Sequence, residues 1–82
     1  MGRRDKLIAK FLDGERAVTW NELVTLLKSF GYIEIKGDGS RVKFDNGNPN
    51  HTINLHRPHP DNQVKRYAVK LVVDKLTRAK ML

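Results

Sequence analysis

The stretch GSRVKFDNGNPNHTINLHRPHP, residues 39–60, predicts two strands, a turn between them and a histidine-proline connector after the second strand. Each strand alternates apolar and polar side chains, and successive side chains of a strand point to opposite faces of its sheet. The apolar set, expected on the buried face, is Val42, Phe44, Ile53 and Leu55. The polar set, expected on the exposed face, is Arg41, Lys43, Thr52, Asn54 and His56. The pattern therefore predicts a sheet with one buried and one open face.

The residues between and after these strands favour turns over regular structure. Residues 45–50, DNGNPN, contain an Asn-Gly pair that tolerates positive φ and a proline that cannot donate to a ladder. We therefore expect an antiparallel hairpin whose loop is longer than two residues. The second strand should end at Arg57, because Pro58 and Pro60 on either side of His59 prevent further strand or helix. The imidazole of His59 should then sit on a stiff connector.

Two helices are expected before this stretch. Residues 3–13 place apolar side chains at helical spacing, namely Leu7, Ile8, Phe11 and Leu12. Thr19 and Glu22 form a capping-box pattern that starts a second helix, and Gly31 ends it. The side chains of that helix expected to face the core are Trp20, Leu23, Val24, Leu26, Leu27 and Phe30. Residues 33–36 alternate apolar and charged side chains and are expected to form a first strand. Residues 37–39, GDG, are expected to form the turn that leads to the next strand.

A last helix is expected from about Val64 to Lys80. Its apolar face, expected to pack on the sheet, comprises Val64, Tyr67, Ala68, Leu71, Val72 and Leu76. The element order is helix, helix, three antiparallel strands, helix. This order predicts one α+β domain over residues 1–82, with a two-layer core at residues 19–79 and helices on one face of the sheet.

The composition indicates a basic surface. The 82 residues include 16 Lys and Arg against nine Asp and Glu, a formal net charge of +7. Such an excess attracts polyanions, with nucleic acid favoured over an anionic membrane. The absence of cysteine excludes disulfides and thiol nucleophiles. The sequence has no apolar run near the roughly 20 residues that a bilayer requires, so we expect a cytoplasmic protein with no membrane association.

Four motifs resemble the HicA family of bacterial toxins. They are residues 30–32 (FGY), 39–44 (GSRVKF), 56–60 (HRPHP) and 67–70 (YAVK), and the resemblance covers roughly residues 19–76. It implies a double-stranded-RNA-binding-domain-like α-β-β-β-α fold with an extra N-terminal helix. It also implies an mRNA interferase, that is, an endoribonuclease acting on mRNA, of a type II toxin-antitoxin system that is neutralised by a HicB-like antitoxin.

One position departs from the family pattern. Many members carry a catalytic histidine directly after the Gly-Ser pair, whereas this chain has Arg41 there. Because arginine stays protonated at neutral pH, Arg41 cannot act as a general base and is expected to hold phosphate electrostatically. Metal-free RNA cleavage needs a base for the 2′-hydroxyl and an acid for the leaving oxygen, and imidazole suits both roles. We therefore predict His56 as the base and His59 as the acid or phosphate donor.

Further polar residues are predicted to bind RNA. They are Lys43, Asn54, Arg57, Lys65, Arg66 and Lys70. The last three lie near the start of the last helix, where cations oppose the helix dipole, which fits either a bound anion or a merely solvated basic face. No metal site and no cofactor are predicted, because the three histidines have few carboxylates and no cysteine nearby. His51 is expected to be an ordinary exposed side chain, and Ser40 a turn residue rather than a nucleophile.

Two functions from different classes remain open at this point. The first is an RNA-cleaving toxin. The second is a binding module of the same shape that holds RNA or its antitoxin without cutting. A DNA-reading role is disfavoured, because no pair of helices shows the spacing and polar recognition face of a helix-turn-helix.

Overall fold

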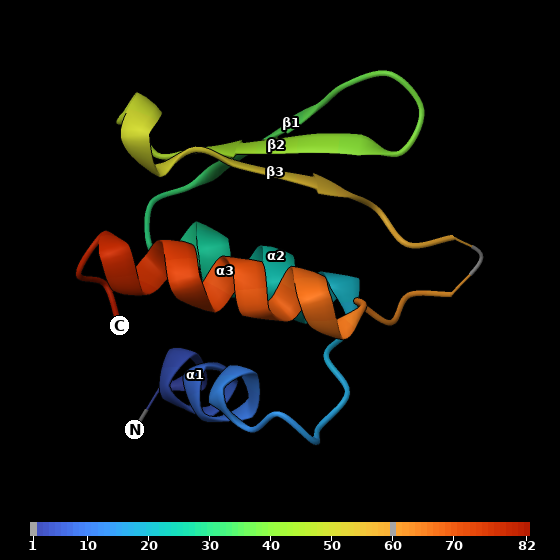
Figure 1. Cartoon of the computed structure of the whole chain (residues 1–82). Coiled ribbons are helices and arrows are strands. Elements are labelled where there is room, and N and C mark those ends of the chain that lie inside the picture. The colour runs from blue at the N-terminus through green and yellow to red at the C-terminus, as the bar shows by residue number, and fades with distance from the viewer. Residues whose placement is uncertain (1, 60) are drawn as a thin grey trace.

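The structure, a computed structural model, describes residues 2–59 and 61–82 of the chain. Its elements are α1 (Arg3–Leu12), α2 (Trp20–Ser29), β1 (Ile33–Lys36), β2 (Arg41–Asp45), a short 3-10 helix (Pro49–His51), β3 (Ile53–His56) and α3 (Arg66–Arg78) (Figure 1). This order confirms the predicted α+β class and the α-β-β-β-α core preceded by an extra helix. No helix within the described ranges is long and apolar enough to span a membrane.

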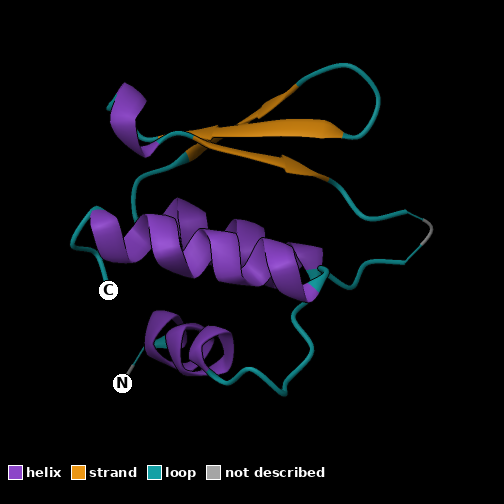
Figure 2. Ribbon diagram, in the orientation of Figure 1, coloured by secondary structure: helices purple, strands orange, loops and turns teal. Residues whose placement is uncertain are grey.

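The three strands form one antiparallel sheet in the order β1-β2-β3. Helix α2 contacts β1 and helix α3 contacts β3 on one face of the sheet, and α1 packs against both helices on the side away from the strands (Figure 2). None of the described elements covers the opposite face. The sheet therefore has a covered face and an open face, as the alternation of β2 and β3 predicts.

The covered face supplies the centre of the core. Val42, Phe44, Ile53 and Leu55 are all buried, whereas the residues between them are exposed or only partly buried. The ring of Phe44 packs on that of Trp20 from α2, with centroids 5.8 Å apart and planes tilted by 52°. Tilted aromatic pairs of this kind add to the stabilisation that burial alone gives.

The start of α2 has the predicted capping box. Thr19 Oγ1 accepts a hydrogen bond from the backbone N–H of Glu22 at 3.2 Å, and the Thr19 N–H donates to Glu22 Oε1 at 2.9 Å. Lys10 Nζ of α1 donates to both oxygens of the same carboxylate, at 2.8 and 2.7 Å. Burial opposes ionisation of Glu22, but the hydrogen bonds from Lys10 and Thr19 outweigh it, so the pKa of Glu22 is lowered. At the other end of α2, Gly31 takes the positive φ of 90° that favours glycine.

The other end of α1 is also attached to α2. The Arg4 guanidinium lies 4.9 Å from the centre of the Phe30 ring, and its Nη1 donates to the carbonyl oxygen of Ser29 at 3.2 Å. A cation over an aromatic face is electrostatically favourable. Together with the ion pair between Lys10 and Glu22, these contacts fix α1 along the helix layer.

Three side chains predicted to face the core are exposed instead. Leu12 is 61% exposed at the end of α1, and Tyr67 and Leu71 of α3 are 67% and 38% exposed. The buried side chains of α3 recur every four residues at Ala68, Val72 and Leu76. Tyr67 and Leu71 lie about 100° around the helix from that row, because each residue advances an α-helix by this angle. The apolar face predicted for α3 therefore included one row of side chains, Tyr67 and Leu71, that does not face the core.

Two strand assignments also need qualification. The side chains of Ile33 and Ile35 lie on the open face, because β1 places Ile35 opposite Lys43 and Ile33 opposite Asp45. They are 59% and 41% exposed. The last strand ends at His56 rather than at Arg57, although the Arg57 N–H still donates to the carbonyl oxygen of Ser40 at 2.7 Å.

The last helix begins two residues later than predicted because a tertiary contact holds the preceding segment extended. Gln63 pairs with Thr19 as an antiparallel bridge, and the Val64 N–H donates to the Val18 carbonyl oxygen at 2.8 Å. In the same way the Trp20 N–H donates to the carbonyl oxygen of Asn62 at 2.6 Å. These bonds anchor the connector between β3 and α3 to the beginning of α2.

The hairpin loop between β2 and β3 is longer than two residues, as predicted. Asn side chains and Asp45 shape it by accepting hydrogen bonds from backbone N–H groups two residues on, at Gly47, Asn48 and Asn50. Such Asx turns are the usual role of these side chains in loops. The loop places His51 in the 3-10 helix, at the opposite end of β3 from His56.

Candidate functional site

The sheet register brings Arg41 and His56 directly opposite one another on the open face. Arg41 of β2 pairs with His56 of β3, and Lys43 pairs with Asn54 two residues along. All four side chains are exposed. Because directly opposed residues of an antiparallel pair have Cβ atoms about 4.5–5.5 Å apart, the guanidinium and the imidazole can reach the same bound group. The alternation in the sequence predicted that Arg41 and His56 share a face, and the strand register shows that they lie directly opposite one another.

A hydrogen bond ties His56 to the turn before β2. Ser40 Oγ lies 3.2 Å from Nδ1 of His56, and the Arg57 N–H to Ser40 carbonyl bond joins the same two segments. A partner on one ring nitrogen orients the imidazole and decides which nitrogen carries the proton. Sequence reasoning missed this contact, because it treated Ser40 as a turn residue without a side-chain role. The signal available in the sequence was the position of Ser40 next to Arg41, the residue that pairs with His56.

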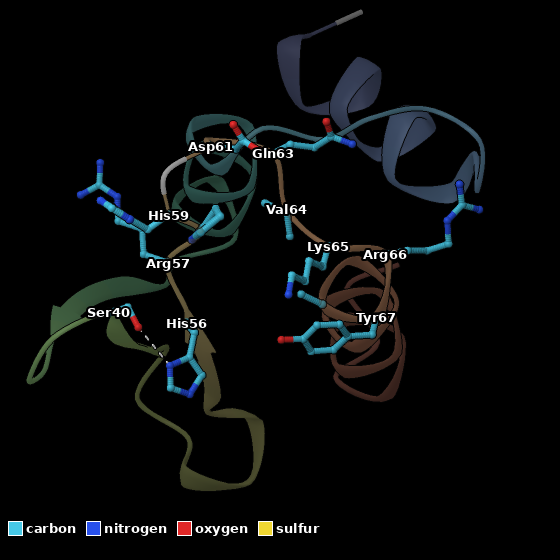
Figure 3. A pocket seen from close by; sticks show the side chains of 12 residues that line it. Ser40, His56, Arg57, His59, Asp61, Gln63, Val64, Lys65, Arg66 and Tyr67 are labelled. Carbon is cyan, nitrogen blue, oxygen red and sulfur yellow. Dashed lines mark hydrogen bonds between the residues drawn. The ribbon is translucent and has the colours of Figure 1, made fainter.

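A cleft of about 490 Å³ opens beside His56, between the end of β3, the connector and the start of α3. The side chains of Tyr67 and Lys65 point across it toward the imidazole of His56 (Figure 3). Its charged borders are Arg57, Lys65 and Arg66 against the single carboxylate of Asp61. Basic residues therefore outnumber acidic ones along its border, Lys65 is the cation among them that points inward, and an aromatic ring lines one side (Figure 3).

A second hollow, of about 420 Å³, lies on the open face itself. Arg41, Lys43, Asn54 and His56 border it, together with Asp38 from the turn. His56 borders both this hollow and the cleft, so it lies between them. A ligand that extends from the open face into the cleft would pass this imidazole.

The profile of a family described as HicA toxin of bacterial toxin-antitoxin matches residues 20–80, which is most of the chain. The chain belongs to the HicA toxin family. The matched residues run from the start of α2 past the end of α3, so they contain the whole sheet and both walls of the cleft. Comparison with curated proteins and with solved structures gave no match.

Two other residues predicted for the site of this HicA-family chain, Arg57 and His59, lie further from the open face. Arg57 and His59 border the cleft, but their side chains lie on the side of the connector turned away from Tyr67 (Figure 3). Both also border a third hollow with Ser40. Pro60, predicted to stiffen this connector, lies outside the described residues.

The three cations predicted near the start of the last helix are exposed but do not gather at one point. They are Lys65, Arg66 and Lys70. Lys65 points into the cleft, whereas the Arg66 side chain extends toward the loop after α1 (Figure 3). Its Nη1 lies close to Gly14, at 3.5 Å from the position that a Cβ atom of this residue would take. Lys70 is not among the residues that line the cleft. In residues 2–59 and 61–82, no three His, Asp or Glu side chains gather as a metal site would require.

Proposed function

We propose that this HicA-family toxin is an endoribonuclease that cuts mRNA by metal-independent acid–base catalysis at His56. The observation that carries the proposal is the direct opposition of Arg41 and His56 on an open sheet face that leads into a basic cleft. Family membership supports the toxin role. The geometry supports the chemistry, because it combines a proton acceptor with a fixed cation that can hold a phosphate.

The proposed step transfers protons and exchanges one phosphorus–oxygen bond. Nε2 of His56 accepts the proton of a ribose 2′-hydroxyl, and the 2′-oxygen attacks the adjacent phosphorus. The bond from that phosphorus to the 5′-oxygen of the next nucleotide breaks, and an imidazolium gives the departing oxygen its proton. The products are a 2′,3′-cyclic phosphate and a 5′-hydroxyl end.

The contact between Ser40 and His56 supports the base role. When Nδ1–H of His56 donates to Ser40 Oγ, the lone pair of the ring is left on Nε2, which faces the substrate. Ser40 is then a positioning residue that selects the tautomer able to accept a proton. Arg41 holds the phosphate with its planar guanidinium, and Lys65 adds a second cation from across the cleft.

We assign the acid role to His59. Of the two other histidines, His59 borders the cleft, whereas His51 lies in the 3-10 helix at the opposite end of β3. Because the His59 side chain lies on the far side of the connector from Tyr67, the acid role requires its imidazole to turn toward the phosphate (Figure 3). Lys43, Asn54, Arg57, Arg66 and Lys70 are all exposed, and we propose that they bind the RNA backbone.

As a toxin of a toxin-antitoxin system, the protein has an antitoxin partner, and we propose a HicB-like, acidic protein that covers the open face. Ile33 and Ile35 support this, because exposed apolar side chains on the open face, opposite Asp45 and Lys43, suit a protein partner better than RNA alone. Hydrogen exchange with and without the antitoxin tests the idea. Protection confined to the helix layer would contradict it.

The test of the proposed function is cleavage of a long single-stranded RNA by purified protein in the presence of EDTA. The wild-type protein should produce fragments that end in 2′,3′-cyclic phosphate. His56→Ala should lower the rate roughly a hundredfold to ten-thousandfold, the usual contribution of a general base. Arg41→Gln should lower it roughly tenfold to a hundredfold, because hydrogen bonds to charged groups contribute about 1.5–3 kcal/mol.

His51→Ala is the matched control, because it removes an imidazole from the loop between β2 and β3, at a distance from the cleft. Its rate should equal that of the wild type. Cleavage that persists unchanged in His56→Ala would refute the base assignment. RNA that stays intact but is retarded on a gel by the wild-type protein would instead identify the non-cleaving binding module of the same fold.

A further inference from the structure

Tyr67 differs from every other aromatic residue of the chain. Phe11, Trp20, Tyr32 and Phe44 are buried in the core, and Phe30 is packed against it. Tyr67 alone is 67% exposed. Exposure of a large ring at the start of a helix costs hydrophobic stabilisation that burial would have given, so packing does not account for a tyrosine at this place.

The ring stands in the cleft rather than on a featureless surface. Tyr67 lies in the first turn of α3, on the wall opposite His56, with Lys65 beside it (Figure 3). The cleft volume of about 490 Å³ falls within the range of about 300–1,000 Å³ that small-molecule sites occupy. One wall thus offers a flat ring and a cation, and the other offers the imidazole of His56.

We propose that Tyr67 is a stacking platform for one base of the RNA, next to the bond that His56 cleaves, and that the substrate is consequently single-stranded there. Aromatic side chains that hold unpaired bases stack on them face to face, with little preference for sequence. A base inside a duplex is already stacked on both sides and cannot also cover Tyr67. Lys65 reaches the phosphate of the same nucleotide. This inference rests on the proposed function, because it names the form of RNA that the cleft accepts.

The experiment measures binding of a fluorescein-labelled 2′-O-methyl oligoribonucleotide by anisotropy. This probe lacks the free 2′-hydroxyl that the proposed cleavage consumes, so affinity is measured without turnover. Tyr67→Ala should weaken binding of the single strand by roughly fivefold to a hundredfold, the usual effect of removing one stacking ring. Tyr67→Phe should bind like the wild type, because it keeps the ring.

Two controls isolate the base. Leu71→Ala removes an exposed apolar side chain one turn further along α3, outside the cleft, and should leave binding unchanged. An oligomer of abasic nucleotides should bind equally to the wild type and to Tyr67→Ala, because it has nothing to stack. Thermal unfolding of all three variants should match that of the wild type, since both positions are exposed.

The outcomes separate this inference from the proposed function. If the wild-type protein binds the RNA but Tyr67→Ala binds it equally well, the stacking role is wrong while the endoribonuclease proposal stands. The stacking role is also wrong if Tyr67→Ala weakens binding of the abasic oligomer as much as that of the complete one, or if the wild type prefers the annealed duplex. A wild-type protein that neither binds nor cleaves RNA would overturn both.

Discussion

Phe44 and Lys43 are neighbours in β2, and their side chains lie on opposite faces of the sheet. Phe44 is fully buried against α2, whereas Lys43 is exposed next to Asn54 and in line with Arg41. The covered face is held by packing, and the open face carries cations and an imidazole that no described element covers. Alternate positions along these strands therefore differ in whether a substitution acts on the fold or on ligand binding.

The largest expected effect separates the two faces directly. Phe44→Ala should lower the free energy of unfolding by about 3–5 kcal/mol, because it leaves a cavity beside Trp20 in the centre of the core. Lys43→Ala should change it by less than about 0.5 kcal/mol, as exposed substitutions usually do. Urea unfolding of both variants measures the difference. Similar losses in the two would show that the open face is covered in solution.

A smaller effect sharpens the description of the open face. Ser40→Ala should slow RNA cleavage roughly twofold to tenfold, because a hydrogen bond contributes about 0.5–1.5 kcal/mol net. The ¹⁵N spectrum of His56 should lose its preference for the form protonated at Nδ1, which a purely structural role of Ser40 would not alter. The matched control is Ser29→Ala, whose hydroxyl donates to the Leu26 carbonyl oxygen at 2.6 Å in α2. If both variants cleave alike, Ser40 does not position the imidazole.

The smallest expected effect is a loss of stability on substitution of Glu22 in α2, within the helix layer that packs on the covered face. The pKa of Glu22 is lower in the folded protein than in the unfolded chain, so its ionised carboxylate stabilises the fold above the ordinary pKa of 4.5. That stabilisation is lost as the pH falls through the lowered pKa. Glu22→Gln, which keeps a capping side chain, should cost a few tenths to about 1 kcal/mol at pH 7.

Urea unfolding between pH 7 and pH 3 checks this prediction. The difference in stability between the wild type and Glu22→Gln should shrink as the pH falls. A difference that stays constant over this range would show that the contacts of Lys10 and Thr19 with the carboxylate do not depend on its charge.

The fold was predictable where the local pattern and the tertiary environment agree. The alternation in β2 and β3, the capping box at Thr19 and the glycine after α2 each have a local physical cause that the sequence displays. The face of β1 was not predictable in this way, because Ile33 to Lys36 alternates equally well in either orientation. Only the pairing of Ile35 with Lys43 puts its isoleucines on the open face. The start of α3 depends on hydrogen bonds to residues 18–20, which no local pattern reveals.

The site was predictable to the level of a shared face. Alternation places Arg41 and His56 on the same side of the sheet, but their direct opposition requires the register. The contact between Ser40 and His56 depends on how the turn folds back onto β3, so it could not be read from spacing. Helical periodicity assigns Tyr67 to the core, because it cannot distinguish the edge of an apolar face from its centre.

The pairing of residues 62–64 with residues 18–20 joins segments that are far apart in the sequence. Until both have been synthesised, the connector has no anchor, and β3 is the only wall of the cleft. A chain that ends before residue 62 therefore lacks one wall of the groove beside His56, together with the core residues of α3. The cleavage proposed at His56 therefore requires a chain synthesised beyond the connector, because residues 62–64 and the start of α3 complete the groove.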